Sequence, residues 1–460
     1  MEQSRRLFGP GSFYKSALAI AVPIMLQQMI QSLVSLVDNF MVAGLGDVSM
    51  SGVNVAGQIL FVFMVFLNTV CMTGGIFMTQ FFGAGDREGM GQAFRFKLVM
   101  GLAAFVPYFL VTIVFPRAVM SLMLIGNTQA DLILNEAVKY MHIMFLMGIP
   151  YTISVCIATS LRDMGQVKIP LYVTMAAMMI NAVLNWILIY GHFGLPRMGV
   201  RGAAYATVIA RAFEFILFIV VYSRLKPAFM IRMADFFKIN GRLFRETLKK
   251  GALILFCEMV WVFSETITTA VYNGRGGADV VSGMAAGFSI ANLLFVAFGG
   301  IYSATGVILG KSLGAGKLEK ARTEKTWLLS GAAVFGLFVM LFGFGTTLIV
   351  PVVYGRLSAS AVKICRDMVM LIAILMPFWL YMNTQQAIAR AGGDTAMGFY
   401  VDGFLTLFVM IPMVLLLGKY TLIGPVMMYA CVKIIDLMKV VIFHFWLKKE
   451  RWLKNLTTVA

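Results

Sequence analysis

The chain has 460 residues, of which 60% are hydrophobic and only 13% are charged. These are too few polar side chains to cover the surface of a water-soluble globule. This composition excludes a soluble fold and indicates a membrane protein. The formal net charge of +17 does not indicate a nucleic-acid binder, because the basic residues are spread over the short loops between apolar runs.

Long apolar runs predict membrane-spanning helices, because each exceeds the ~20 residues that a crossing helix needs. The first run is also too long for the apolar part of a signal peptide, so we expect it to be retained. Six runs lie in each half, and we predict an all-α integral membrane protein with twelve transmembrane helices. The predicted helices are 16–44, 49–81, 93–116, 134–160, 165–191 and 200–223, then 248–274, 280–312, 325–352, 361–390, 395–418 and 423–447.

The sequence also contains an internal repeat. Gly-Ala-Gly at 83–85 recurs at 314–316, and Arg-Asp-Met-Gly at 162–165 is echoed by Arg-Ala-Gly-Gly at 390–393. An even number of helices per half gives both halves the same orientation, which predicts two parallel repeats around a central cavity. We expect an N-lobe at 1–223, a basic linker at 224–250 and a C-lobe at 251–460; a repeat kept only for scaffolding is the alternative.

The distribution of basic residues predicts the orientation of the chain. Most lysines and arginines fall in loops on the same side as the N-terminus, among them Arg87, Lys97, Lys168 and Arg322. Since cytoplasmic loops carry the excess of basic residues, we expect both termini in the cytoplasm and the protein in the inner (plasma) membrane.

Asp38 is the first candidate functional residue. It ends a polar stripe on the first helix that also contains Gln27, Gln31 and Ser35, all on one face. A charged carboxylate inside a membrane costs about 2.5–3.5 kcal/mol, so this face is expected to line a cavity. Pro23 would bend the helix and act as a hinge. An interfacial acid that caps the helix end is the alternative.

Three polar residues of the fifth and sixth helices could accompany Asp38. Asn181 and Asn185 lie one turn apart on one helical face, and Thr207 lies in a stretch of small residues that permits close helix packing. Their oxygens could coordinate a hard cation such as Na⁺. Their alternative role is hydrogen bonding between helices.

The second half carries different acids. Glu258, Trp261 and Glu265 share one face of the seventh helix, an arrangement that suits an organic cation. In the tenth helix, Pro377 predicts a hinge, and Tyr381 and Asn383 would line the second lobe, although packing is the alternative for both. Glu265 could instead lie near the outer interface or pair with a loop lysine.

Other charges are expected to neutralise one another. Lys433, Asp436 and Lys439 are spaced at i, i+3 and i+6, and Arg211 precedes Glu214 by three residues. No clustered nucleophile, metal-ligand set or phosphate-binding loop occurs in the sequence. We therefore predict neither an enzyme nor a cofactor. Any uphill transport would draw on an ion gradient or on a partner subunit, and the duplicated single chain favours the ion gradient.

Together these residues resemble the multidrug and toxic compound extrusion (MATE) family over essentially the whole chain. The resemblance rests on the two Gly-Ala-Gly loops, Val-Asp-Asn at 37–39, the Asn181/Asn185 pair, Gly-Val-Arg-Gly-Ala-Ala at 199–204 and Arg-Ala-Gly-Gly-Asp-Thr at 390–395. Asn185 stands where one branch has a second Asp, so the chain is more similar to the NorM-like than to the DinF-like branch.

The resemblance implies an antiporter that exports amphipathic organic cations or drugs in exchange for H⁺ or Na⁺ by alternating access, working as a monomer among membrane lipids without an obligate partner. Asp38, Asn181, Asn185 and Thr207 match the family's N-lobe cation site, and Glu258 matches its C-lobe acid. The Asp expected in the tenth helix is missing, with Trp379 near its place. A flippase for lipid-linked precursors, from the same superfamily, is the alternative function.

Overall fold

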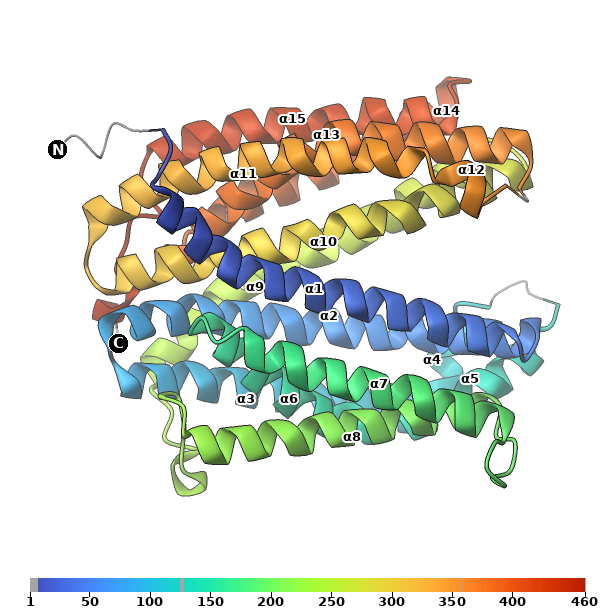
Figure 1. The fold of residues 1–460 in the computed structure, drawn as a ribbon, viewed down its shortest axis with the longest axis horizontal. Coiled ribbons are helices and arrows are strands. Elements are labelled where there is room, and N and C mark those ends of the chain that lie inside the picture. The colour runs from blue at the N-terminus through green and yellow to red at the C-terminus, as the bar shows by residue number, and fades with distance from the viewer. Residues whose placement is uncertain (1–6, 125–127, 356, 460) are drawn as a thin grey trace. The chain divides into compact units, whose positions relative to one another are not determined.

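The computed structural model describes residues 7–124, 128–355 and 357–459, and nearly all of them are helical (Figure 1). The first half contains α1 (Gly11–Ala43), α2 (Asp47–Ala84), α3 (Arg87–Phe109) continued by the π-helix η2 (Leu110–Val114), the short α4 (Pro116–Ser121), α5 (Ala130–Met144), the 3₁₀ turn η3 (Phe145–Met147), α6 (Gly148–Asp163), α7 (Lys168–Tyr190) and α8 (Val200–Leu225).

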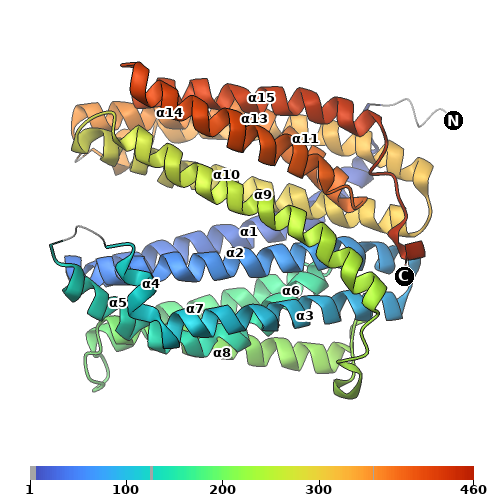
Figure 2. The ribbon, with the colours of Figure 1, turned by 180° about the vertical axis from the view of Figure 1, so that it is seen from behind.

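The second half follows a 3₁₀ turn η4 (Met233–Asp235). It contains α9 (Gly241–Asn273), α10 (Ala278–Gly314), α11 (Leu318–Thr347), the short α12 (Val350–Val353), α13 (Ala359–Ala391), the π-helices η5 (Gly398–Gly403) and η6 (Thr406–Met410), α14 (Ile411–Tyr420), α15 (Pro425–Lys448) and η7 (Leu456–Val459). Figure 2 shows the same helices from behind. The all-α prediction is confirmed.

Ten helical segments in the described part of the chain are long and apolar enough to cross a membrane, so the protein is a multi-pass membrane protein. They are Gly11–Ala43, Asp47–Ala84, Arg87–Val114, Ala130–Asp163, Lys168–Tyr190, Val200–Leu225, Gly241–Asn273, Ala278–Gly314, Leu318–Thr347 and Gly398–Tyr420. Helices α13 and α15 have 33 and 24 residues but are not among these ten.

Several helices begin earlier than predicted. We expected starts at 93 and 325, whereas α3 begins at Arg87 and α11 at Leu318. In both cases a charged or polar first turn extends the helix beyond its apolar run, where hydropathy gives no signal. Asp86 caps α3, because its carboxylate accepts a hydrogen bond from the Gly89 backbone N–H at 3.0 Å.

The Asp86 cap gives a first test. Asp86→Ala is expected to lower the free energy of unfolding by about 1 kcal/mol, because the Gly89 N–H loses its acceptor. The measurement is the apparent melting temperature in detergent, with the exposed Asp367→Ala as a matched control. Equal melting of the two variants would contradict this role of Asp86.

Left-handed glycines occupy matching places in the two repeats. Gly85 and Gly316 have φ of +72° and +71°, and Gly165 and Gly393 have φ of +80° and +75°. Each pair is the last glycine of its repeated motif. Because only glycine adopts this conformation without strain, the repeat is present in the backbone conformation as well as in the amino-acid sequence.

The chain divides into two compact units. The C-terminal unit comprises the described residues within 1–25, 79–85 and 248–460. The N-terminal unit comprises the described residues within 26–78 and 86–247. The chain passes between the units inside α1, two residues after Pro23, and again inside α2 at residue 79.

Within the C-terminal unit, the last turns of α2 and α10 touch backbone to backbone. A Cβ at Gly83 would lie 2.2 Å from the Lys311 carbonyl oxygen, and one at Gly314 would lie 1.8 Å from the Gln80 carbonyl oxygen. The glycines that begin each Gly-Ala-Gly motif therefore permit a contact that no other residue would allow.

The segment after α15 is anchored beside this contact. The Gln80 amide donates to the Ala391 carbonyl oxygen at 2.7 Å, and its oxygen accepts from the Leu456 N–H at 2.7 Å. The Trp452 carbonyl oxygen lies against Gly392, where a Cβ would meet it at 1.5 Å. One side chain of α2 thus joins the end of α13 to residues 452–456.

Candidate functional site

Asp38 lies in a polar cluster of the N-terminal unit. The Asn185 amide nitrogen of α7 donates to Asp38 Oδ1 at 2.6 Å. In the amide orientation that satisfies both polar atoms of Asn181, its nitrogen donates to Asp38 Oδ2 at 2.9 Å and its oxygen accepts from the Thr207 N–H at 3.3 Å. The structure therefore brings together the four residues that the sequence suggested for a cation site.

The cluster has oxygen atoms to spare. Asn185 Oδ1 is buried and has no hydrogen-bond partner in the described part of the chain. Thr207 Oγ1 donates to the Ala203 carbonyl oxygen at 3.0 Å. In the other orientation of the Asn181 amide, Asn181 Nδ2 donates to Thr207 Oγ1 at 3.4 Å. Carboxylate, amide and hydroxyl oxygens are the groups that bind hard cations.

No lysine or arginine of the described residues forms an ion pair with Asp38. The nearest basic group that influences it is Arg211 on α8, and that guanidinium pairs with Glu214 at 2.7 Å, as the sequence predicted. Among the described residues, only neutral amide donors form hydrogen bonds with the Asp38 carboxylate.

A second series of hydrogen bonds in the N-terminal unit connects α1, α7 and α8. The Gln27 amide of α1 donates to Thr174 Oγ1 at 3.0 Å, and Thr174 donates to Glu214 at 3.0 Å. Arg211 in turn lies over the Tyr151 ring, 5.1 Å from its centroid. The two ends of the polar stripe on α1 therefore face the interior of the N-terminal unit, whereas Gln31 and Ser35 between them are exposed.

Glu258 of α9 has a basic partner, unlike Asp38. The Arg390 guanidinium of α13 lies 3.5 Å from Glu258 Oε1, and Arg390 also stacks over the Tyr302 ring. Arg390 is the arginine of the second repeated motif. The two acids that the sequence offered for ion coupling therefore lie in different electrostatic surroundings.

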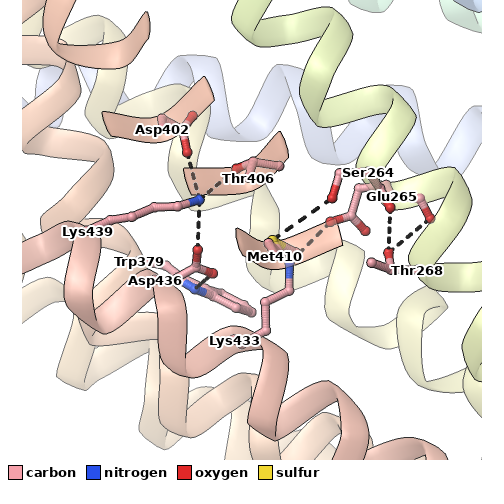
Figure 3. A network of polar contacts seen from close by, with 10 residues as sticks. All are labelled: Ser264, Glu265, Thr268, Trp379, Asp402, Thr406, Met410, Lys433, Asp436 and Lys439. Carbon is pink, nitrogen blue, oxygen red and sulfur yellow. Dashed lines mark hydrogen bonds and ion pairs between the residues drawn. The ribbon is translucent and has the colours of Figure 1, made fainter. Parts of the chain in front are cut away.

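Glu265 follows Glu258 by about two turns on α9 and pairs with Lys433 of α15 at 3.2 Å (Figure 3). Lys439 pairs with Asp436 at 3.2 Å, as predicted, and also with Asp402 of η5 at 2.8 Å. For Lys433 the ion-pair partner is Glu265 rather than Asp436, because its side chain reaches across to α9.

The remaining predicted cavity residues are not joined to these acids. No hydrogen bond or ring contact within the described ranges links Trp261, Tyr381 or Asn383 to Glu258 or Glu265. Trp261 is 50% exposed, and Asn383 Oδ1 is buried without a hydrogen-bond partner. Pro23 and Pro377 lie inside α1 and α13.

Sequence reasoning did not assign three residues to the acids that they contact. Tyr140 of α5 is buried beside Thr207 and Asp38, and Arg390 and Lys433 provide the counter-charges of the C-terminal unit. Arg390 could have been found from the repeated motif. Tyr140 and Lys433 could not, because only the packing of distant helices brings them to the acids.

Comparison with known proteins agrees with the fold. The MatE family profile matches residues 23–187 and again residues 254–416. The chain belongs to the MatE family. The double match also places one copy of the family's repeat in each half of this MatE protein, as the repeated motifs predicted, and identifies it as a membrane transporter.

Several curated relatives of this MatE protein are named NorM. It is 24% identical over 421 residues to "Probable multidrug resistance protein NorM" of Thermotoga maritima, covering 89% of this chain and 87% of the relative. It is also 24% identical over 426 residues to the protein of that name from Pasteurella multocida, covering 89% and 88%. The predicted closeness to the NorM-like branch is confirmed.

Solved structures share the fold. The structures described as "Crystal structure of MATE in the bent conformation" and "Crystal structure of MATE in the straight conformation" both align with a TM-score of 0.84 at 18% identity. The first alignment covers 100% of both chains and the second covers 98% of both.

Proposed function

We propose that this MatE protein is a cation-coupled antiporter that exports amphipathic, mostly cationic organic compounds by alternating access. The observation that carries the proposal is the half-buried Asp38 carboxylate, which is held by two asparagine amides and forms no ion pair with a described residue. The names of the NorM relatives support a multidrug substrate range.

Either H⁺ or Na⁺ could act as the coupling ion at this site. Protonation of Asp38 would remove its charge directly. Sodium would find the Asp38 carboxylate, the unpartnered Asn185 Oδ1, the Asn181 oxygen and the Thr207 hydroxyl as ligands. No further cofactor enters the proposal.

Competition provides the coupling. An organic cation is attracted by a negatively charged Asp38, and a bound H⁺ or Na⁺ cancels that attraction. By linkage each cation weakens the binding of the other by the same factor. Pro23 interrupts the hydrogen bonding of α1 where the chain passes between the two units, so a hinge there could transmit the change to the gates.

The proposal includes the finer architecture: twelve transmembrane helices as two parallel six-helix lobes around a central cavity, with α13 and α15 completing the set. The protein would work as a monomer in the inner membrane with both termini in the cytoplasm. Cysteine scanning of the loops with an impermeant thiol reagent in intact cells and inverted vesicles tests this orientation.

The decisive experiment is transport in liposomes. Efflux of ethidium is followed while a proton gradient and a sodium gradient of matched electrical potential are imposed separately. Movement with either gradient supports the proposal and identifies the ion. If neither gradient moves ethidium, the antiporter is wrong and the lipid-precursor flippase becomes the function to test.

Glu258→Gln is expected to slow gradient-driven efflux several-fold, because the Arg390 guanidinium would keep its charge beside a neutral amide. Initial efflux rates under a saturating gradient measure this. Glu319→Gln, at an acid whose side chain is 81% exposed, is the matched control. Unchanged efflux in Glu258→Gln would remove this acid from the mechanism.

A further inference from the structure

The Lys433 ammonium of the C-terminal unit lies in a cage of the kind that binds organic cations. Its Nζ is 3.2 Å from Glu265 Oε1, 5.4 Å from the centroid of the Tyr429 ring and 5.9 Å from that of Trp379 (Figure 3 shows Glu265, Trp379 and Lys433). A carboxylate and two aromatic faces are the groups by which proteins recognise alkylammonium ions.

The cage is held by contacts that do not involve Lys433. The Trp379 indole N–H donates to Asp436 Oδ2 at 3.0 Å, which fixes the ring. Tyr429 is held edge-on by Tyr272, with 5.7 Å between ring centroids, and by Phe288, with 5.9 Å. Because these rings are buried and packed, their positions are set before any cation arrives.

Lys433 uses this cage poorly. An ammonium has three N–H donors, yet Lys433 makes one hydrogen bond within the described part of the chain, to Glu265. Lys439, two turns further along α15, reaches Asp402 at 2.8 Å, Thr406 at 3.0 Å and Asp436 at 3.2 Å. Lys439 is therefore a fully paired structural lysine, whereas Lys433 is not.

An unused acceptor lies beside the cage. The Tyr272 hydroxyl is buried and has no hydrogen-bond partner among the described residues, although the charges of Lys433 and Glu265 act on it. A buried hydroxyl without a partner costs free energy, so a ligand that reached it would gain a hydrogen bond that Lys433 does not make.

Glu265 is the most exposed member of the cage. The Glu265 side chain is 32% exposed, whereas the Lys433 side chain is 11% exposed. A cation can therefore approach Glu265 at its exposed part, and the flexible lysine stem allows the ammonium to move away when it does.

We propose that Glu265, Trp379, Tyr429 and Tyr272 form a binding site for the ammonium group of an organic amine, and that Lys433 is its tethered internal occupant. An incoming alkylammonium must displace Lys433 from Glu265. The site thus selects against weakly bound cations, because the tether keeps a competing ammonium at high local concentration. The inference rests on the proposed function only in that the displaced site would serve an exported amine.

The test replaces Lys433 by alanine and supplies a free alkylammonium ion in its place. Lys433→Ala deletes the atoms of n-propylammonium, and this ion is titrated calorimetrically into the purified full chain without any gradient. We expect Lys433→Ala to bind it at least about tenfold more tightly than the unchanged protein. Lys419→Ala, at an exposed lysine over the Tyr420 ring, is the matched control and should gain nothing.

A double variant identifies the site. Lys433→Ala with Glu265→Gln keeps the aromatic rings of the cage but removes the carboxylate charge, so the gain should disappear. Binding by Lys433→Ala no tighter than in the unchanged protein, or a gain that survives Glu265→Gln, would overturn the proposal.

Stability provides an independent reading. n-Propylammonium should raise the apparent melting temperature of Lys433→Ala, whereas neutral n-propanol should not; equal effects of the two would contradict the ammonium site. If Lys433→Ala cannot be purified, Lys433→Gln replaces it in the same titrations. Because no transport is measured, failure here leaves the antiport proposal standing, and failure of antiport leaves this site standing.

Discussion

Asp38→Asn is expected to reduce gradient-driven efflux of ethidium to the rate of protein-free liposomes. The variant keeps the shape of the side chain and can still meet the Asn185 amide, now through a carbonyl oxygen. It removes the one negative charge of the cluster, so neither H⁺ nor Na⁺ can be exchanged against a cationic substrate. The measurement is the initial efflux rate under an imposed proton or sodium gradient.

The control for this prediction is Asp47→Asn, which makes the same chemical change at an exposed position in the first turn of α2. It should transport at the unchanged rate. Equilibrium ethidium exchange in the absence of a gradient separates lost coupling from lost substrate access. Efflux by Asp38→Asn at more than about a tenth of the unchanged rate, a loss of less than about 1.4 kcal/mol, would refute a coupling role for this carboxylate.

Gly314→Ala is expected to destabilise the protein strongly, because the added methyl group has no room at this backbone contact. Its Cβ would lie 1.8 Å from the Gln80 carbonyl oxygen, and a backbone atom cannot turn aside as the end of a side chain can. The last turns of α2 and α10 must therefore separate. Overpacking of this kind costs about 1–3 kcal/mol or more, which should lower the apparent melting temperature by several degrees.

Two matched variants define the effect. Gly83→Ala attacks the same contact from the other side and should behave alike, since its Cβ would meet the Lys311 carbonyl oxygen at 2.2 Å. Gly306→Ala lies on the same helix as Gly314 but has nothing within 4 Å of its Cβ, so it should melt like the unchanged protein. If Gly306→Ala and Gly314→Ala melted alike, close backbone contact would not be the reason for these glycines.

Helical runs and the repeat could be predicted from the sequence because both are local. The lengths of the apolar runs predicted the positions of the helices within several residues. The two Gly-Ala-Gly motifs predicted the duplication, and the double family match agrees with it. The interruptions inside helices were not predicted. The π-helices at 398–403 and 406–410 leave no mark in hydropathy, since every residue there is still helical.

The candidate site divides in the same way. Asp38, Asn181 and Asn185 could be named because polar residues are rare in apolar helices, and spacing placed both asparagines on one face. The sequence could not show which acids carry internal partners. Arg390 and Lys433 reach Glu258 and Glu265 from helices more than a hundred residues away. Only three-dimensional packing decides that Asp38 receives no such partner among the described residues.

The anchoring of residues 452–456 has a practical consequence for spectroscopy. Leu456 is hydrogen-bonded to Gln80 and Trp452 is buried, so a fluorophore or spin label placed at the exposed Thr458 starts two residues from a fixed point. Its signal will report how the C-terminal unit itself moves, where a label on a loose tail would average that motion away.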